Sequence, residues 1–175
     1  ISDVLKEYKR APIMIVPGNK ANSDIEINER GEISYLHVNG IQLADTEHTL
    51  CGFLYEAFSQ DDYDRYLSQY LTARLDWALE DFQKIGIEAG NPNYAMFVPT
   101  LDCFAKREDG ADIRIRMPRE ATEKLGCPEY ADYSVTISKN TVYVDFAWFN
   151  KPATRVAEAM WLKFTPLCGG KIMLR

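Results

Sequence analysis

The strongest constraint on the fold is an alternation of apolar and polar residues, interrupted by turn signals, over residues 24–45. In "DIEINERGEISYLHVNGIQLAD", Ile25 and Ile27 alternate with polar neighbours, and the same alternation returns after "NERG". A period of two places successive side chains on opposite faces of a β-strand. Asn39-Gly40 is a strong hairpin turn, because both residues tolerate positive φ. The segment therefore predicts three successive antiparallel strands.

Strand patterns return along most of the remaining chain. Short apolar or alternating runs bounded by turn residues indicate further strands. These runs are 13–16, 49–58, 93–108, 111–117, 132–138, 141–149 and 159–164. In "ADIRIRM" the isoleucines alternate with arginines, which is typical of a strand with one face in water.

A change of period predicts a helical insertion at about 60–84. Apolar residues there recur at intervals of three and four, as on an amphipathic helix with one face on a core. Ser59 and Asp62 supply an N-cap and a carboxylate in the first turn, and Gly86 ends the helix. A break is expected near 74–76. "PREATEKLG" adds a short second helix, since Pro begins it and Gly ends it.

These patterns predict a mainly β fold with an inserted helix (α+β), arranged as an antiparallel β-sandwich in a single domain over residues 1–175. A chain of 175 residues can bury roughly 70% of its unfolded surface, so the core needs no disulfides or metal ions. Because the sequence begins at Ile1 and ends in strand-like residues, we expect it to be a segment of a longer protein.

Composition excludes several classes of function. The net charge is −6 and the Lys and Arg residues are scattered, whereas binding to a phosphate backbone needs clustered cations. We therefore expect no nucleic-acid partner. No apolar run approaches the roughly 20 residues that span a bilayer, and no signal-peptide pattern is present, so we expect no membrane partner.

The cysteines predict free thiols rather than a metal site. Cys51, Cys103, Cys127 and Cys168 form no C-x-x-C pair and have no histidine at ligand spacing. We therefore expect no metal and no cofactor. Free, mostly buried thiols are typical of a reducing compartment, which favours a cytoplasmic location.

Motifs identify no catalytic residue. The sequence has no G-x-S-x-G, P-loop or G-x-G-x-x-G pattern. Its two histidines, His37 and His48, lie on a predicted strand and in a polar loop, without an evident carboxylate partner. We interpret both as surface or hydrogen-bonded structural histidines.

A polar stretch near the end, "NKPATRVAEAMW", permits two interpretations. In the first it connects two strands and is tied by a loop-borne ion pair between Arg155 and Glu158. In the second it contacts a sugar. Trp148 or Trp161 would then stack on the ring, while Lys151, Arg155 and Glu158 hydrogen-bond its hydroxyls.

Several stretches resemble large proteins whose N-terminal part is similar to the family 38 glycoside hydrolases, the α-mannosidases. They are "FLYEAFSQDDYDRYLSQYL", "DWALEDFQK" and "FNKPATRVAEAMWLKF". "IEINERGEISYLHVNG" is similar to the opening of the C-terminal supersandwich of those enzymes, a galactose-mutarotase-like β fold. The resemblance covers most of residues 20–165.

This resemblance implies a supporting role. In family 38 enzymes the zinc ion and the nucleophilic aspartate belong to the N-terminal α/β portion, and nothing in this sequence matches that portion. The chain would then be a non-catalytic β-sandwich segment. Its partner would be an N-terminal glycoside-hydrolase-like portion of the same protein, against which it packs through an exposed apolar patch. It would serve as scaffold and as a wall of a carbohydrate cleft.

Two other functions stay open. An autonomous mutarotase-type enzyme would use the same sandwich with an acid and a base around a sugar ring, for which His37 and His48 are the available histidines. A free-standing carbohydrate-binding module would require Trp148 or Trp161 to be exposed.

Overall fold

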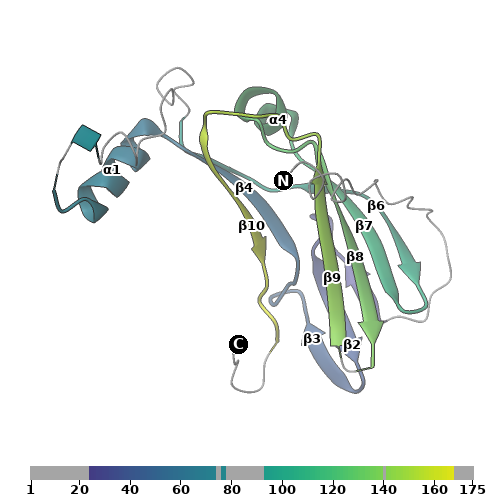
Figure 1. The fold of residues 1–175 in the computed structure, drawn as a ribbon. Helices are drawn as coiled ribbons and strands as arrows, with labels where there is room; N and C mark the ends of the chain where they lie inside the picture. Colours follow the sequence, from purple (N-terminus) through teal and green to yellow (C-terminus); the bar gives the residue numbers. More distant parts are fainter. Residues whose placement is uncertain (1–23, 74–75, 78–92, 140, 168–175) are drawn as a thin grey trace, which may run out of the picture.

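The computed structural model describes residues 24–73, 76–77, 93–139 and 141–167, and it is rich in antiparallel β-structure (Figure 1). The strands are β1 (Ile25–Ile27), β2 (Ile33–Val38), β3 (Ile41–Ala44), β4 (Gly52–Phe58), β5 (Ala95–Phe97), β6 (Thr100–Arg107), β7 (Gly110–Arg116), β8 (Tyr130–Ser138), β9 (Thr141–Phe149) and β10 (Ala157–Lys163). The helices are α1 (Gln60–Tyr70) and α4 (Arg119–Leu125).

The strands form three sheets whose orders are β1-β2-β3, β10-β4-β5 and β6-β7-β8-β9. All pairings within them are antiparallel. An isolated bridge between Ile33 and Leu50 joins the first sheet to the chain just before β4. The first two sheets share one hydrophobic core with the four-stranded sheet, which gives a sandwich-like arrangement.

The core is built from alternate residues of the strands, as a period of two requires. On β7 and β8, Ile113, Ile115 and Val135 are fully buried. From β4, Phe53 lies with its ring 5.4 Å from that of Phe146 on β9, so the two layers meet directly. Burial of these side chains supplies most of the stabilisation, at roughly 25 cal/mol per Å² of apolar surface.

The opposite face of the four-stranded sheet is polar, as the alternation in "ADIRIRM" predicts. Arg114 binds Asp132 through two hydrogen bonds, 2.7 Å from Nε to Oδ1 and 2.8 Å from Nη2 to Oδ2. Arg107 binds Asp112 and also donates to the Ser134 hydroxyl. These paired charges cover the sheet on this side, so its buried face is the one that meets the other two sheets.

The three strands predicted over residues 24–45 are confirmed. Asn39 and Gly40 have φ values of 50° and 83°, the left-handed values that the predicted hairpin turn requires. The strand predicted at 93–108 is divided into β5 and β6 around Pro99, which has no N–H to donate to a ladder. The strand predicted at 13–16 and Cys168 lie outside the described residues.

Helix α1 departs from its prediction in two ways. Its start is confirmed: Ser59 and Asp62 form a complete capping box. The helix ends at Tyr70, however, and the next three residues are not helical, so the break comes before the expected 74–76. The remainder of the predicted insertion, apart from a helical pair at 76–77, lies outside the described residues, as does Gly86.

The expectation that this helix packs one face on the core is wrong for α1, none of whose residues is buried. The helix begins just after β4 and extends away from the sandwich (Figure 1). Its apolar stripe consists largely of tyrosines, namely Tyr63, Tyr66 and Tyr70, whose rings contact one another along the helix. Because a phenol hydroxyl is well solvated, such a stripe does not require a core.

Within the described ranges, neither helix is long and apolar enough to cross a membrane.

Two buried thiols predict an alkaline limit to stability. Burial raises the pKa of Cys51 and of Cys127 from the ordinary 9.0 to about 12. Between these values the unfolded chain has lost thiol protons that the folded chain keeps, so the unfolding free energy falls as pH rises. We expect the unfolding free energy to fall by about 1.4 kcal/mol per pH unit for each thiol.

Urea unfolding followed by circular dichroism from neutral pH into this window measures the slope. Cys127→Ala removes one titrating group, so its unfolding free energy is expected to fall less steeply with pH than that of the wild type. Equal slopes for the two proteins would contradict the assignment.

Candidate functional site

The connection between β9 and β10 is anchored at the end of α4. The helix stops at Gly126, whose φ of 78° is left-handed, and its last carbonyls lack partners within the helix. Two side chains approach them: the Lys151 ammonium donates, and the Tyr55 hydroxyl has one proton for either a helix carbonyl or Glu158. Lys151 Nζ lies 3.0 Å from the Gly126 carbonyl oxygen, and Tyr55 Oη lies 2.8 Å from that of Leu125. The polar stretch therefore begins by capping a neighbouring helix.

The same two side chains hold Glu158. Lys151 Nζ lies 2.7 Å from Glu158 Oε1 and 2.9 Å from Oε2, and Tyr55 Oη lies 2.6 Å from Oε2. The side chains of Lys151 and Glu158 are 18% and 17% exposed, and Tyr55 is fully buried. The pKa of the Tyr55 phenol is raised, mainly because the group is buried and secondly because it is bonded to Glu158. We call Tyr55, Lys151 and Glu158 the inner cluster.

The inner cluster corrects the predicted loop-borne pair. Glu158 lies within β10 rather than in a loop, and its carboxylate is bound by Lys151 and Tyr55. Lys151 reaches the carboxylate from the other end of the connection, just after β9. Arg155 is exposed in the connection itself. The stretch is thus a strand connection, as the first interpretation holds, and Lys151 supplies a cation at Glu158 that the interpretation did not name.

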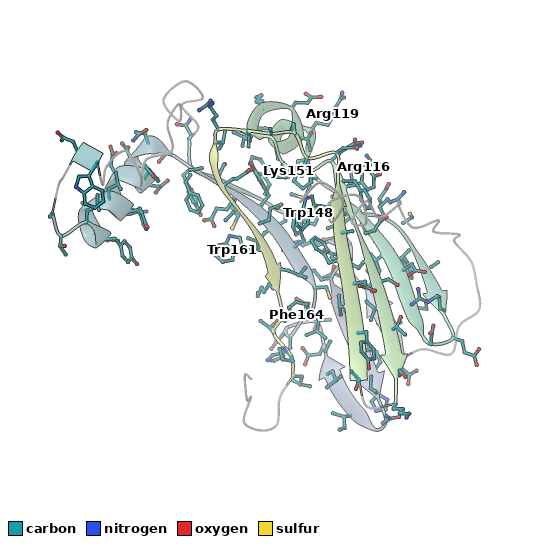
Figure 2. All side chains as sticks on the ribbon, in the orientation of Figure 1. Arg116, Arg119, Trp148, Lys151, Trp161 and Phe164 are labelled. Atoms are coloured by element: carbon teal, nitrogen blue, oxygen red, sulfur yellow. The ribbon has the colours of Figure 1, made fainter. Side chains whose placement is uncertain are left out.

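The two tryptophans predicted as sugar platforms are both half-exposed, Trp148 at 48% and Trp161 at 50%, but they lie on different sheets. Trp148, on β9, lies 6.0 Å from Phe146 on the core-facing side of its sheet. Trp161 lies beside β10 and points away from β9 (Figure 2). The five predicted residues therefore do not form one site, because Lys151 and Glu158 lie on the other face of β10 from Trp161.

Trp161 belongs instead to a polar and aromatic surface on the outer face of the β10-β4-β5 sheet. Its Nε1 donates to Glu56 Oε2 at 2.9 Å, and Tyr94 Oη donates to Glu56 Oε1 at 2.8 Å. Met96, paired with Glu56 across the sheet, adds an exposed apolar side chain. We call Glu56, Tyr94, Met96 and Trp161 the Glu56 surface.

Hydrogen bonding fixes the aromatic rings of this surface. Each carboxylate oxygen of Glu56 takes one aromatic donor, so the indole and the phenol are held on either side of it. The bond to Glu56 raises the pKa of the Tyr94 phenol. Sequence reasoning missed Glu56 and Tyr94. The available signal was Glu56 itself, the single charge in the apolar run "GFLYEAF".

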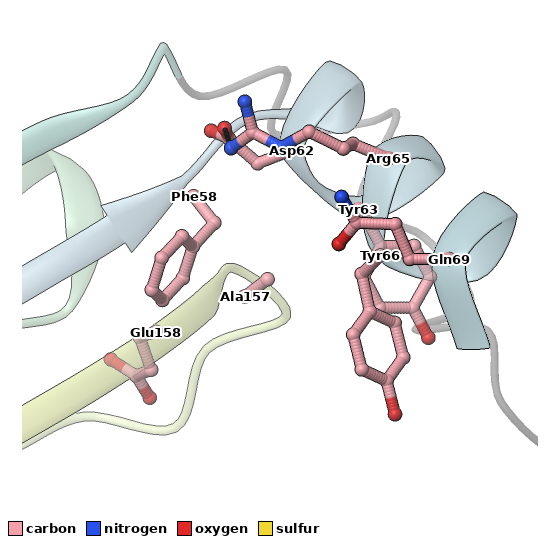
Figure 3. A pocket seen from close by; sticks show the side chains of 8 residues that line it. All are labelled: Phe58, Asp62, Tyr63, Arg65, Tyr66, Gln69, Ala157 and Glu158. Carbon is pink, nitrogen blue, oxygen red and sulfur yellow. Dashed lines mark hydrogen bonds and ion pairs between the residues drawn. The ribbon is translucent and has the colours of Figure 1, made fainter.

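A groove of about 480 Å³ adjoins this surface, between α1 and the ends of β4 and β10 (Figure 3). Its lining residues are Phe58, Asp62, Tyr63, Arg65, Tyr66, Gln69, Ala157 and Glu158. The Phe58 ring lies 6.2 Å from the Tyr94 ring, which connects the groove to the Glu56 surface. Arg65 is paired with Asp62 at 2.8 Å. The groove is therefore aromatic, with polar groups at its rim.

A second cavity, of about 560 Å³, lies beside α4. Its cations are paired with carboxylates: Arg116 lies 2.7 Å from Glu129, and Arg119 lies 3.2 Å from Glu123. Asn150 also donates to Glu129, and these bonds lower the pKa of the Glu129 carboxyl. The arrangement is an exposed ion-pair network.

The histidines have local partners. His48 Nδ1 lies 2.9 Å from Asp45 Oδ1 in one turn, and this bond lowers the pKa of Asp45. His37 Nδ1 lies 3.5 Å from Asp24 Oδ2. Neither histidine lines the groove or the cavity beside α4. No group of three or more His, Cys, Asp or Glu able to hold a metal ion occurs in the part of the chain that the structure describes.

Comparison with known proteins places the chain in a family. A family model described as a domain of unknown function (DUF5054) matches residues 19–143. The chain belongs to this family. No curated protein and no solved structure matches it. The DUF5054 match contains Glu56, Tyr94 and α1, whereas the polar stretch and β10 follow it, so the Glu56 surface combines residues from inside and outside the matched range.

The inner cluster of this DUF5054 chain predicts an asymmetric mutational response. Lys151→Met leaves the Glu158 carboxylate without its cation in a largely buried position, and we expect a loss of about 3 kcal/mol of unfolding free energy. Adding Glu158→Leu removes the uncompensated charge and is expected to restore most of this loss.

Urea denaturation of both variants measures the effect. Lys124→Met is the matched control, because Lys124 pairs with Glu120 at 3.5 Å on the exposed face of α4. It is expected to change stability by less than about 1 kcal/mol. A Lys151→Met protein as stable as the control would refute an anchoring role for the cluster.

Proposed function

We propose that this chain is the non-catalytic β-sandwich portion of a glycoside-hydrolase-like protein. It acts as scaffold, and its Glu56 surface forms one wall of a carbohydrate cleft. In this proposal the sandwich is a galactose-mutarotase-like supersandwich segment. Its partner is an N-terminal glycoside-hydrolase-like portion of the same protein. The resemblance to family 38 enzymes supports the architecture, and the Glu56 surface supports the sugar contact.

The observation that carries the proposal is the bond from Trp161 Nε1 to Glu56, whose other oxygen accepts from Tyr94. An exposed ring held at a fixed angle offers its face to the C–H groups of a sugar at little entropic cost. The carboxylate between the rings is an acceptor for sugar hydroxyls. Aromatic platforms next to a fixed acceptor are what recognition of a polyhydroxylated ring needs.

Exposed apolar residues away from the Glu56 surface support packing against another portion of the protein. Trp148 and Tyr143 on β9 are 48% and 58% exposed, and Phe164 just after β10 is 47% exposed. Among the described residues, β9 and β10 are edge strands of their respective sheets. Exposed apolar side chains on edge strands are typical of contact surfaces; Trp148 and Tyr143 lie on opposite faces of β9, five residues apart.

The exposure of Trp161 also fits a second candidate function, a free-standing carbohydrate-binding module. Both functions use the Glu56 surface, and they differ in whether a hydrolase portion accompanies it. A mutarotase-type enzyme receives less support, because His37 and His48 are bonded to nearby aspartates and lie apart from the groove lining.

The proposal predicts that Trp161→Ala weakens sugar binding. We expect at least a tenfold rise in Kd, about 1.4 kcal/mol, for a neutral saccharide measured by titration calorimetry. Trp148→Ala is the matched control, since it removes an equally exposed indole from the other sheet. The saccharides titrated are neutral ones of the gluco, galacto and manno series.

Circular dichroism of both variants shows whether the fold is kept. Equal affinities for the two variants would remove Trp161 from the site, and an absence of sugar binding by the wild type would overturn the proposed function.

A further inference from the structure

We infer that the groove between α1 and β10 is a second sugar subsite, so that the ligand is a neutral oligosaccharide of at least two units lying along β10. This inference rests on the proposed function, because it takes the Glu56 surface as the first subsite. It adds the length, the direction and the charge of the ligand.

The length follows from the geometry of β10. Ala157, which lines the groove, and Trp161 are four residues apart on the strand and therefore point to the same face. At about 3.3 Å per residue they are separated by roughly 13 Å. A single pyranose ring is shorter than this distance. A ligand that touches both places must contain at least two rings.

The path between the two places is lined continuously by side chains that suit a sugar. From Trp161 it passes to Glu56 and Tyr94 through hydrogen bonds, and then to Phe58 through the 6.2 Å ring contact. Phe58 already lines the groove. No change of face or of sheet interrupts this sequence of contacts, so one extended ligand can follow it.

The groove itself presents a second aromatic platform. Tyr63 and Tyr66 of α1 stack with ring centroids 6.1 Å apart and face Phe58 and Ala157 across the groove (Figure 3). Gln69, one turn further along α1, adds an amide that can donate to or accept from hydroxyls. Rings with a polar rim are the same combination as at the Glu56 surface.

The charges select a neutral ligand. Asp62 is neutralised by Arg65 at 2.8 Å, and Glu158 by Lys151 at 2.7 Å. Glu56 accepts from the neutral donors Trp161 and Tyr94, so these bonds leave its negative charge in place. An acidic sugar would bring a second negative charge beside this carboxylate, which costs binding free energy. The ligand class is therefore the uncharged oligosaccharides.

The test compares Tyr66→Ala with Tyr70→Ala. Tyr66 lines the groove, whereas Tyr70 contacts the Tyr66 ring from further along the helix, is 71% exposed and does not line the groove. No residue of α1 is buried, so both variants are expected to fold. Calorimetry with the mono-, di- and trisaccharide of the neutral sugar bound best by the wild type gives the Kd for each length.

We expect Tyr66→Ala to raise the Kd of the di- and trisaccharide about tenfold and to leave that of the monosaccharide unchanged, while Tyr70→Ala changes none of them. Replacing the disaccharide by one that contains a uronic acid is expected to weaken binding to the wild type.

Three results would overturn the inference. They are equal affinities of Tyr66→Ala and the wild type at every length, an equal loss at every length, and undiminished binding of the acidic disaccharide. If Trp161→Ala still weakens binding at least tenfold in these cases, the proposed function stands and the second subsite alone fails. If the wild type binds no sugar, both fail together.

Discussion

The inward orientation of Glu158 determines which side chains of β10 point to the exterior. Its carboxylate is bound by Lys151 and Tyr55, and a largely buried charge of this kind cannot turn to the other face without losing both partners. Because side chains alternate along a strand, the residue three positions later must point outward. That residue is Trp161. One interior ion pair therefore sets the register that brings the indole onto the exterior beside Glu56.

The two faces of this sheet consequently serve different purposes. Inside, Lys151 donates to both the Glu158 carboxylate and the Gly126 carbonyl, so the turn at Gly126 and the β9–β10 connection form one unit. The single proton of the Tyr55 hydroxyl serves either Glu158 or the Leu125 carbonyl. Outside, the partners of Glu56 are exposed aromatic rings. A carboxylate paired with a cation is a structural group, whereas one held only by neutral donors keeps its negative field available to a ligand.

Features that depend on near neighbours could be predicted from the sequence, because their determinants lie within a few residues. The turn at Asn39-Gly40 and the capping box of Ser59 and Asp62 are examples. The bond between Trp161 and Glu56 joins residues 105 positions apart, and no local pattern specifies it. The bond from Lys151 to Glu158 could not be chosen from the sequence, because Lys151 and Arg155 are equivalent cations there. The helix–carbonyl environment that favours Lys151 arises only from the fold.

Burial of Cys51 and Cys127 has a chemical consequence beyond stability. The thiolate is the species that reacts with oxidants, alkylating agents and disulfides. With a pKa of about 12, each thiol is thiolate in roughly one molecule in 100,000 at neutral pH, and each side chain is almost inaccessible. Neither residue is therefore open to modification in the folded protein. Their reduced state is a property of the fold, which would preserve it in an oxidising environment as well as in a reducing one.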